Sequence, residues 1–419
     1  METIPVLESI KVIISKMRIG IVTSWFERGA AYVSRQFMDV LQKTDEVFIY
    51  ARGGENYAKG DPKWDLPNVY WGKHTGFVHY FASYIVKGDF IKWLKRERIE
   101  LVFFNEQHYF SPIVWCKDLG IKTAAYIDYY TENTIPFFNA YDCLVCNTER
   151  HKFAFRNHPN AQYLKWGTNI SLYKPTDSEN SILTFFHSAG MGPFRKGTDL
   201  LIKAFYNSKS RAKAKLFIHT QVSLSEKFPE LRTIINELLA EGSLEIEEGT
   251  VSAPGLYYKG DVYVYPSRLD GIGLTLMEAA SSGLACITVD NAPMNEFVNP
   301  SFASLARIDY YYCRSDGYYW PMGVVSLDSL SSLIEDYISG LYNVSEMKAK
   351  AREYAESELD FNKNTERLHN IFESVKVSQL SNILRSKIKS YDRLPIHRLM
   401  YFFYKLYQPI KKIERRQMR

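Results

Sequence analysis

Asp270 and Glu278 are the side chains whose types and spacing best indicate a chemical site. They stand eight residues apart, with a glycine-containing turn between them. Residues 262–266 form a short apolar run of β-branched and aromatic side chains, which is typical of a buried parallel strand. We predict a strand, a turn that carries Asp270, and a helix with Glu278 near its start, so that both carboxylates face the crevice beyond the strand end and can accept hydrogen bonds from hydroxyl groups. The alternative is an ordinary strand-turn-helix with a solvated Asp and a Glu favoured by the helix dipole.

The backbone of Gly273, Leu274 and Thr275 is predicted to bind an anion. Gly271 and Gly273 supply turn chemistry, and the residues from Leu274 to 280 have high helix propensity. The N–H groups of residues 273–275 should therefore lie at an open helix N-terminus. Such a terminus binds phosphate groups.

Arg195 and Lys196 form a second motif, about eighty residues upstream. We predict a strand at 182–187, a loop of small residues at 188–193 and then an amphipathic helix that begins with these two cations. Arg can bind a phosphate bidentately and Lys acts as a point charge, so the pair suits a diphosphate whose charge grows as it departs. A solvated pair is the alternative, but the helix dipole disfavours cations at this end, which favours a bound anion.

The order of elements at 261–296 resembles the retaining glycosyltransferases of family 4, which have the GT-B fold and carry two glutamates separated by seven residues. This chain has Asp270 in the first of those positions. The small-residue loop and the pair Lys196 and Gly197 are similar to the family's glycine loop and Lys-Gly pair. Met191 stands where the family often has Arg, and Arg195 can substitute for it. The resemblance covers about residues 17–375.

The resemblance implies transfer of a hexose from a UDP- or GDP-linked sugar to a glycan acceptor, with no metal and no cofactor. Arg195, Lys196 and the amides of 273–275 would hold the donor diphosphate. Glu278 would hold the ribose, and Asp270 would orient the donor sugar. The run at 244–251 is predicted to be a strand that ends in a small-residue loop. The family places the nucleotide base at such a strand end. Thr250 and Val251 are therefore candidates for contact with the nucleoside.

The N-terminal half alternates strands and helices, so the fold class is α/β with two doubly wound, Rossmann-like domains. Strands are predicted at 18–23, 47–50, 101–104, 123–127 and 141–146, and helices at 32–41, 90–96 and 112–119. Ligand groups should gather beyond the strand ends. The resemblance implies that Gly29 approaches the diphosphate. Candidates for sugar or acceptor contacts are Glu106, His108, Asp128 and Tyr129. Of these, we place Asp128 in the catalytic set.

Five parts of the chain are predicted. Residues 1–16 are an extension, 17–172 an N-terminal acceptor domain and 173–360 a C-terminal nucleotide-sugar domain. Residues 361–377 form one helix that returns to the N-terminal domain, as the resemblance implies, and 378–419 form a basic aromatic tail. The chain of 419 residues is long enough for two such domains.

The composition, with 46% hydrophobic and 24% charged residues, is that of a globular protein. No apolar run approaches the ~18 residues of a membrane span, and the start lacks the features of a signal peptide, so we expect a cytoplasmic protein. Five cysteines do not make a disulfide framework. Cys143 and Cys146 invite a zinc hypothesis, but in a strand their spacing points them to opposite faces, so no metal site is predicted.

The tail holds eleven Lys and Arg but only two acidic residues, beside an aromatic patch at 399–407. It suits an anionic membrane surface and hence a lipid-linked acceptor, while a helix packed on the body or a self-association arm are alternatives. No nucleic-acid motif accompanies the charge. The alternative function is a catalytically silent scaffold or sensor that binds sugar nucleotides, since Asp270 and Met191 depart from the family pattern.

Overall fold

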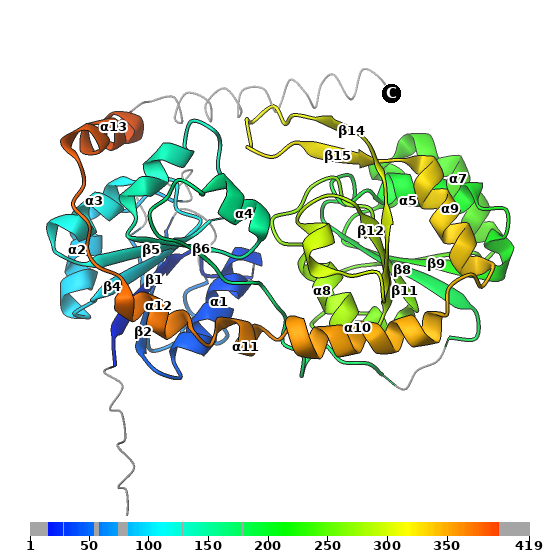
Figure 1. Cartoon of the computed structure of the whole chain (residues 1–419), viewed down its shortest axis with the longest axis horizontal. Helices are drawn as coiled ribbons and strands as arrows, with labels where there is room; N and C mark the ends of the chain where they lie inside the picture. The colour runs from blue at the N-terminus through cyan, green and yellow to red at the C-terminus, as the bar shows by residue number, and fades with distance from the viewer. Residues whose placement is uncertain are drawn as a thin grey trace, which may run out of the picture. The chain divides into compact units, whose positions relative to one another are not determined.

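The computed structural model describes residues 16–27, 29–53, 58–73, 83–127, 129–176 and 180–393. These residues form two parallel α/β sheets with accompanying helices (Figure 1). The chain divides into two compact units. Unit 1 comprises Met1–Tyr126, Asn139–Leu144 and Arg367–Arg419, and unit 2 comprises Ile127–Phe138 and Val145–Glu366.

The first sheet has the strand order β3-β2-β1-β4-β5-β6-β7. Its strands are β1 Arg18–Thr23, β2 Glu46–Ala51, β3 Val69–Trp71, β4 Leu101–Asn105, β5 Lys122–Tyr126, β6 Cys143–Cys146 and β7 Ala161–Tyr163. Its helices are α1 Gly29–Leu41, α2 Lys87–Arg96, α3 Ser111–Asp118 and α4 Glu149–Ala154. A Cβ on Gly20 would lie 2.4 Å from the ring of Trp93, so this glycine lets α2 pack closely on β1. Both α1 and α2 begin three residues earlier than predicted, because the sequence pattern marks only their apolar faces.

The second sheet has the order β10-β9-β8-β11-β12-β13. Its strands are β8 Leu183–Gly190, β9 Ala214–Thr220, β10 Leu244–Glu248, β11 Val262–Tyr265, β12 Ala285–Val289 and β13 Ala303–Ala306. This is the order of a doubly wound Rossmann sheet, in which the topological switch point lies between the first and fourth strands, here β8 and β11. Its main helices are α5 Thr198–Asn207, α7 Arg232–Ala240, α8 Leu274–Ser281, α9 Leu327–Ile338 and α10 Val344–Glu358.

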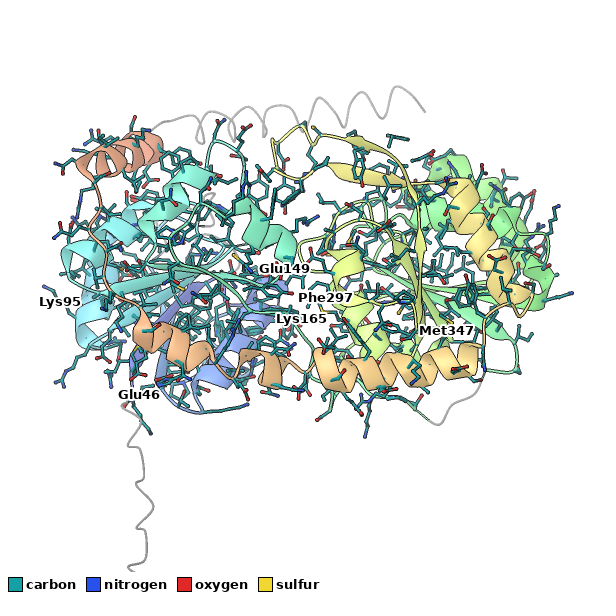
Figure 2. All side chains as sticks on the ribbon, viewed as in Figure 1. Glu46, Lys95, Glu149, Lys165, Phe297 and Met347 are labelled. Atoms are coloured by element: carbon teal, nitrogen blue, oxygen red, sulfur yellow. The ribbon has the colours of Figure 1, made fainter. Side chains whose placement is uncertain are left out.

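Shorter elements complete the two units. A hairpin of β14 Ile308–Tyr312 and β15 Met322–Val325 follows the second sheet, and α6 Leu224–Lys227 and the 3-10 turns η2 Ile135–Ala140, η3 Arg211–Lys213, η4 Pro229–Leu231, η5 Tyr257–Lys259 and η6 Met294–Phe297 lie in loops. Side chains fill the space between sheets and helices, with Met347 of α10 buried (Figure 2).

The segment predicted as one returning helix is two helices, α11 Phe361–Thr365 and α12 Leu368–Ser374. In unit 1, His369 bonds to Asp45 at 2.8 Å and Phe372 packs on Phe103. The last described helix is α13 Asn382–Arg393. The division between the two compact units passes through the first sheet within β6. These units therefore do not test the predicted domain boundaries, which stay a prediction.

Candidate functional site

Two loops meet at the switch point of the second sheet. One follows β8 and the other follows β11, and the N–H of Arg268 donates to the carbonyl of Arg195 at 2.8 Å. Gly197 precedes α5 with a φ of 73°, and a Cβ there would lie 2.0 Å from the carbonyl oxygen of Pro266. Only glycine fits this close approach. The glycine of the Lys-Gly pair therefore holds the two loops together.

Two buried polar contacts lock the same junction, and the sequence analysis missed both. His187 bridges the carbonyl of Val264 and the hydroxyl of Thr198, each at 2.8 Å. Burial lowers the pKa of His187 to about 3, so the ring is neutral at pH 7. Arg268 forms a bidentate pair with Asp199 at 2.7 Å. Val264 lies 77 residues from His187, Asp199 lies 69 from Arg268 and Thr198 lies 11 from His187, so no local pattern signals these contacts.

Asp270 lies in the loop after β11, as predicted, and receives hydrogen bonds from its own unit. Arg195 Nη1 donates to its Oδ2 at 2.6 Å, and the Tyr265 hydroxyl donates to the same oxygen. The N–H groups of Ile272 and Gly273 face Oδ1 at 3.4 and 3.2 Å. Burial acts to raise the pKa of Asp270, but the charges of Arg195 and Lys196 and these hydrogen bonds outweigh it. The pKa is therefore held well below its usual range.

Arg195 and Lys196 lie in the loop before α5, rather than in the helix itself. The charge of Asp270 raises the pKa of Arg195, whose side chain is 41% exposed. The Lys196 ammonium lies 5.4 Å from the centre of the Tyr265 ring. Burial lowers the pKa of Lys196 to about 8, although Asp270 and Glu278 act in the opposite direction. Within the described ranges no carboxylate forms an ion pair with Lys196.

The start of α8 offers backbone donors beside these cations. Gly273 has a φ of 80° and precedes the helix without a side-chain cap. Its N–H faces Asp270, whereas the N–H groups of Leu274 and Thr275 make no backbone hydrogen bond in the described part of the chain. Helix N-termini of this kind bind anions. Two of the three predicted amides are thus open to a ligand.

Glu278 is in the second turn of α8 and receives a hydrogen bond from the hydroxyl of Tyr257 at 2.5 Å. Burial raises its pKa, while hydrogen bonds from Tyr257 and Tyr173 and the charge of Lys196 act to lower it. Tyr257 belongs to η5, and nothing in the sequence around it marks it as a partner of Glu278.

Arg150, which the sequence analysis did not select, also supports the Asp270 loop. Its guanidinium donates to the carbonyls of Asp270 and Ala292 and stacks on Trp320 at 5.2 Å. Glu296 receives the N–H groups of Glu149 and Arg150 at the start of α4. Burial raises the pKa of Glu296.

The remaining predicted contacts stay predictions. Thr250 follows β10 and bonds to Gln221 at 3.1 Å, with Val251 beside it. Tyr129 stacks on Tyr318 with ring centres 5.2 Å apart. In unit 1, Gly29 is the first residue of α1, and Glu106 and His108 follow β4. Asp128, the extension 1–15 and the tail beyond residue 393 lie outside the described residues.

Metal-binding residues do not gather in the part of the chain that the structure describes, where no group of three His, Cys, Asp or Glu side chains is arranged for an ion. Cys143 and Cys146 are both buried in β6. None of the described helices has the length and apolar character needed to cross a membrane.

The two parallel-sheet α/β domains have the GT-B fold, as the sequence predicted, and solved structures share it. One is a glycosyltransferase from Rickettsia africae, with 14% identity, a TM-score of 0.67 and coverage of 86% of this chain and 98% of that one. HepE of Anabaena, in complex with UDP and glucose, has 14% identity, a TM-score of 0.63 and coverage of 85% and 100%. The pneumococcal O-GlcNAc transferase GtfA, in complex with UDP and GlcNAc, has 14% identity, a TM-score of 0.64 and coverage of 86% and 99%.

The second sheet also matches a family model. Residues 183–306 match the family described as glycosyl transferases group 1. No match was found among curated proteins. The matched segment contains Arg195, Lys196, Asp270 and Glu278, and together with the fold it supports a GT-B glycosyltransferase.

Proposed function

We propose that the protein is a retaining glycosyltransferase that moves a hexose from a nucleotide sugar to a glycan hydroxyl. The observation that carries this proposal is the meeting of Arg195, Lys196 and the open amides of α8 at the switch point of the second sheet. Two cations and a helix N-terminus at which the amides of Leu274 and Thr275 have no side-chain cap form a site for a strongly charged anion such as a diphosphate.

In the proposed reaction, an acceptor hydroxyl oxygen bonds to the anomeric carbon on the face from which the nucleotide leaves. The bond from that carbon to the diphosphate oxygen breaks, and the hydroxyl proton passes to the departing diphosphate. Arg195, Lys196 and the amides of Leu274 and Thr275 stabilise the charge that grows on this leaving group. Glu278 accepts from the ribose hydroxyls. Such preorganised charge stabilisation and positioning can supply most of the rate enhancement without a protein nucleophile.

UDP is the first nucleotide to test, because two of the similar structures contain it. We would measure thermal stabilisation of wild type and Glu278→Ala by UDP-, GDP-, ADP- and CMP-sugars. A ligand at ~100 times its dissociation constant adds ~2.7 kcal/mol to the folded state. We expect one nucleotide class to stabilise the wild type and not the variant. If no nucleotide sugar stabilises the wild type, the proposal is wrong.

Turnover separates the enzyme from a silent sensor. The selected donor, incubated with the wild type and candidate glycan acceptors, should give a glycoside with the anomeric configuration of the donor. Binding without any turnover over a wide range of acceptors would instead support a sugar-nucleotide sensor or scaffold. Inversion of configuration would contradict the retaining mechanism alone.

We also propose that the acceptor is lipid-linked and that the basic tail, 378–419, brings the protein to an anionic membrane. A truncation after Arg393 keeps every residue of α13. It should lose binding to phosphatidylserine-containing vesicles while keeping the nucleotide-sugar shift. If the truncated protein still sediments with these vesicles, the tail is not the membrane contact.

A further inference from the structure

The hydrogen bonds around Asp270 leave it no free acceptor site. A carboxylate has about four lone-pair sites on its two oxygens. Arg195 and Tyr265 donate to Oδ2, and the N–H groups of Ile272 and Gly273 approach Oδ1. Four donors therefore match four acceptor sites. A sugar hydroxyl would have to displace one of them.

The length of the side chain fits this arrangement. Asp and Asn side chains reach backbone N–H groups two and three residues ahead, as in turns and helix caps. Ile272 and Gly273 are the residues two and three ahead of Asp270, at the start of α8. The additional methylene of a Glu would carry the carboxylate past these N–H groups. Aspartate is thus the acidic residue suited to shape this turn.

Asp270 also fixes how Arg195 is presented. Arg195 Nη1 donates to Asp270 at 2.6 Å and to the carbonyl of Leu269 at 2.8 Å, and the Tyr265 hydroxyl also lies within hydrogen-bond reach of the guanidinium. The edge formed by Nε and Nη2 remains for a ligand, and 41% of the side chain is exposed. Guanidinium edges of this kind bind phosphate oxygens in a bidentate manner.

We infer that Asp270 is a positioning residue for the diphosphate site, which orients Arg195 and shapes the start of α8, and that it does not itself bind the donor sugar. This inference rests on the proposed function. It replaces the prediction from sequence resemblance that Asp270 orients the donor sugar. The donor-sugar hydroxyls must then be bound by other residues.

The test is titration calorimetry on the full chain with pyrophosphate, UDP and UDP-glucose. Asp270→Ala should weaken binding of all three by a similar factor, about tenfold. Loss of a negative charge alone would strengthen anion binding, so a weakening has to come from lost positioning. Asp270→Glu should behave like the alanine variant. Asp270→Asn keeps one carbonyl oxygen for the Gly273 N–H, so its affinities should lie between those of wild type and Asp270→Ala. If the alanine variant does not fold, the asparagine variant takes its place in the comparison with wild type.

A double variant distinguishes positioning from a general structural role. If Asp270 acts through Arg195 and the α8 turn, the pair Asp270→Ala and Arg195→Ala should bind pyrophosphate only slightly more weakly than Arg195→Ala alone, by the part of the loss that comes from the turn. A merely structural role would give additive losses and a lower melting temperature.

Two outcomes would overturn the inference and leave the proposed function standing. In one, Asp270→Ala binds pyrophosphate and UDP as tightly as wild type but loses UDP-glucose. In the other, Asp270→Glu binds UDP-glucose as tightly as wild type. A wild type that binds none of the three ligands, and is stabilised by no other nucleotide sugar, overturns the proposed function and this inference together.

Discussion

Arg52 in unit 1 and Arg195 in unit 2 both follow strands of a parallel sheet, but their guanidinium groups are used differently. Arg52 is 3% exposed and donates to the carbonyls of Asn105 and Glu106 and to side chains of Gln107 and Ser24. Arg195 donates from Nη1 to two groups of its own unit, and its side chain is 41% exposed. The first joins three loops, whereas the second keeps an edge for a ligand. A cationic side chain beyond a strand end therefore indicates a binding site only when some of its hydrogen-bond donors have no acceptor within the protein.

The largest expected effect is that of Arg52→Ala on stability. The change leaves several buried acceptors without a donor, and Glu106, at a φ of 51°, loses a contact that holds its backbone. We expect the free energy of unfolding of unit 1 to fall by about 3 kcal/mol, measured by chemical denaturation. Arg96→Ala is the control, since Arg96 is 53% exposed and should cost under ~1 kcal/mol. Equal effects of the two changes would show that Arg52 is not structural.

Arg195→Ala should have the opposite profile, with little loss of stability and a large loss of activity. Its ion pair with Asp270 is partly exposed, so we expect a cost of at most ~1 kcal/mol in unfolding free energy. In the assay with the selected donor, kcat/KM should fall about 100-fold, which corresponds to ~2.7 kcal/mol.

Arg195→Lys sharpens this test because it keeps the charge and removes the bidentate geometry. It should recover part of the activity. Full activity of Arg195→Ala would remove the basis of the comparison between the two arginines.

Lys196 should give the site a pH dependence. Its pKa of about 8 means that the ammonium loses its proton as pH rises through this value in the free protein. Affinity for UDP-glucose should therefore fall by up to tenfold between pH 7 and pH 9, measured by calorimetry. The unfolded chain binds more protons at this lysine between about 8 and its ordinary value of 10.5, so this group makes folding more favourable as pH rises there.

The matched variant is Lys196→Arg, whose charge persists over this range. Its affinity should change little with pH. If wild type and variant lose affinity equally between pH 7 and pH 9, another group is responsible.

The sequence predicted the Rossmann-like class of both sheets and strands such as β1, β4 and β11, because buried parallel strands are continuous apolar runs that are visible locally. It did not predict β3, β7 or β9. It also placed Asp270, Glu278, Arg195 and Lys196 in one unit, because each follows or opens a predicted element. It did not predict Arg52, His187 or Tyr257. Their partners are 11 to 77 residues away in the chain, and only the folded sheet brings them together.

The sequence also did not show that the acceptor sites of the Asp270 carboxylate are occupied by donors of the protein, and the reason is related. A carboxylate in a glycine-containing turn can either accept from a ligand or accept from the turn itself, and the residue types are the same in both cases. The side-chain length distinguishes the two only when the backbone N–H groups of Ile272 and Gly273 are placed. By contrast, the single charge of Arg52 directly after an apolar strand was a usable signal, because a buried cation there needs several acceptors.

The smallest predicted effect is that of Tyr257→Phe, and it tests whether Glu278 is held for its ligand as Arg195 is held for the diphosphate. Tyr257 donates to Oε2 of Glu278 at 2.5 Å, and Tyr173 is a second hydrogen-bond partner of this carboxylate. Loss of one such hydrogen bond costs about 1 kcal/mol, so affinity for UDP should fall about fivefold. Tyr206→Phe is the matched control, because Tyr206 donates to Glu237 in an exposed pair.

The pH profile separates this role from simple packing. Burial already raises the pKa of Glu278, and the Tyr257 hydrogen bond acts to lower it. Without that bond the carboxyl should protonate at still higher pH, so that UDP affinity is lost earlier as pH falls. Between the ordinary and the raised pKa the folded state binds more protons, and stability from this group therefore decreases as pH rises through that interval. If Tyr257→Phe lowers UDP affinity without moving the acidic limb of the profile, Tyr257 only fills space beside the ligand.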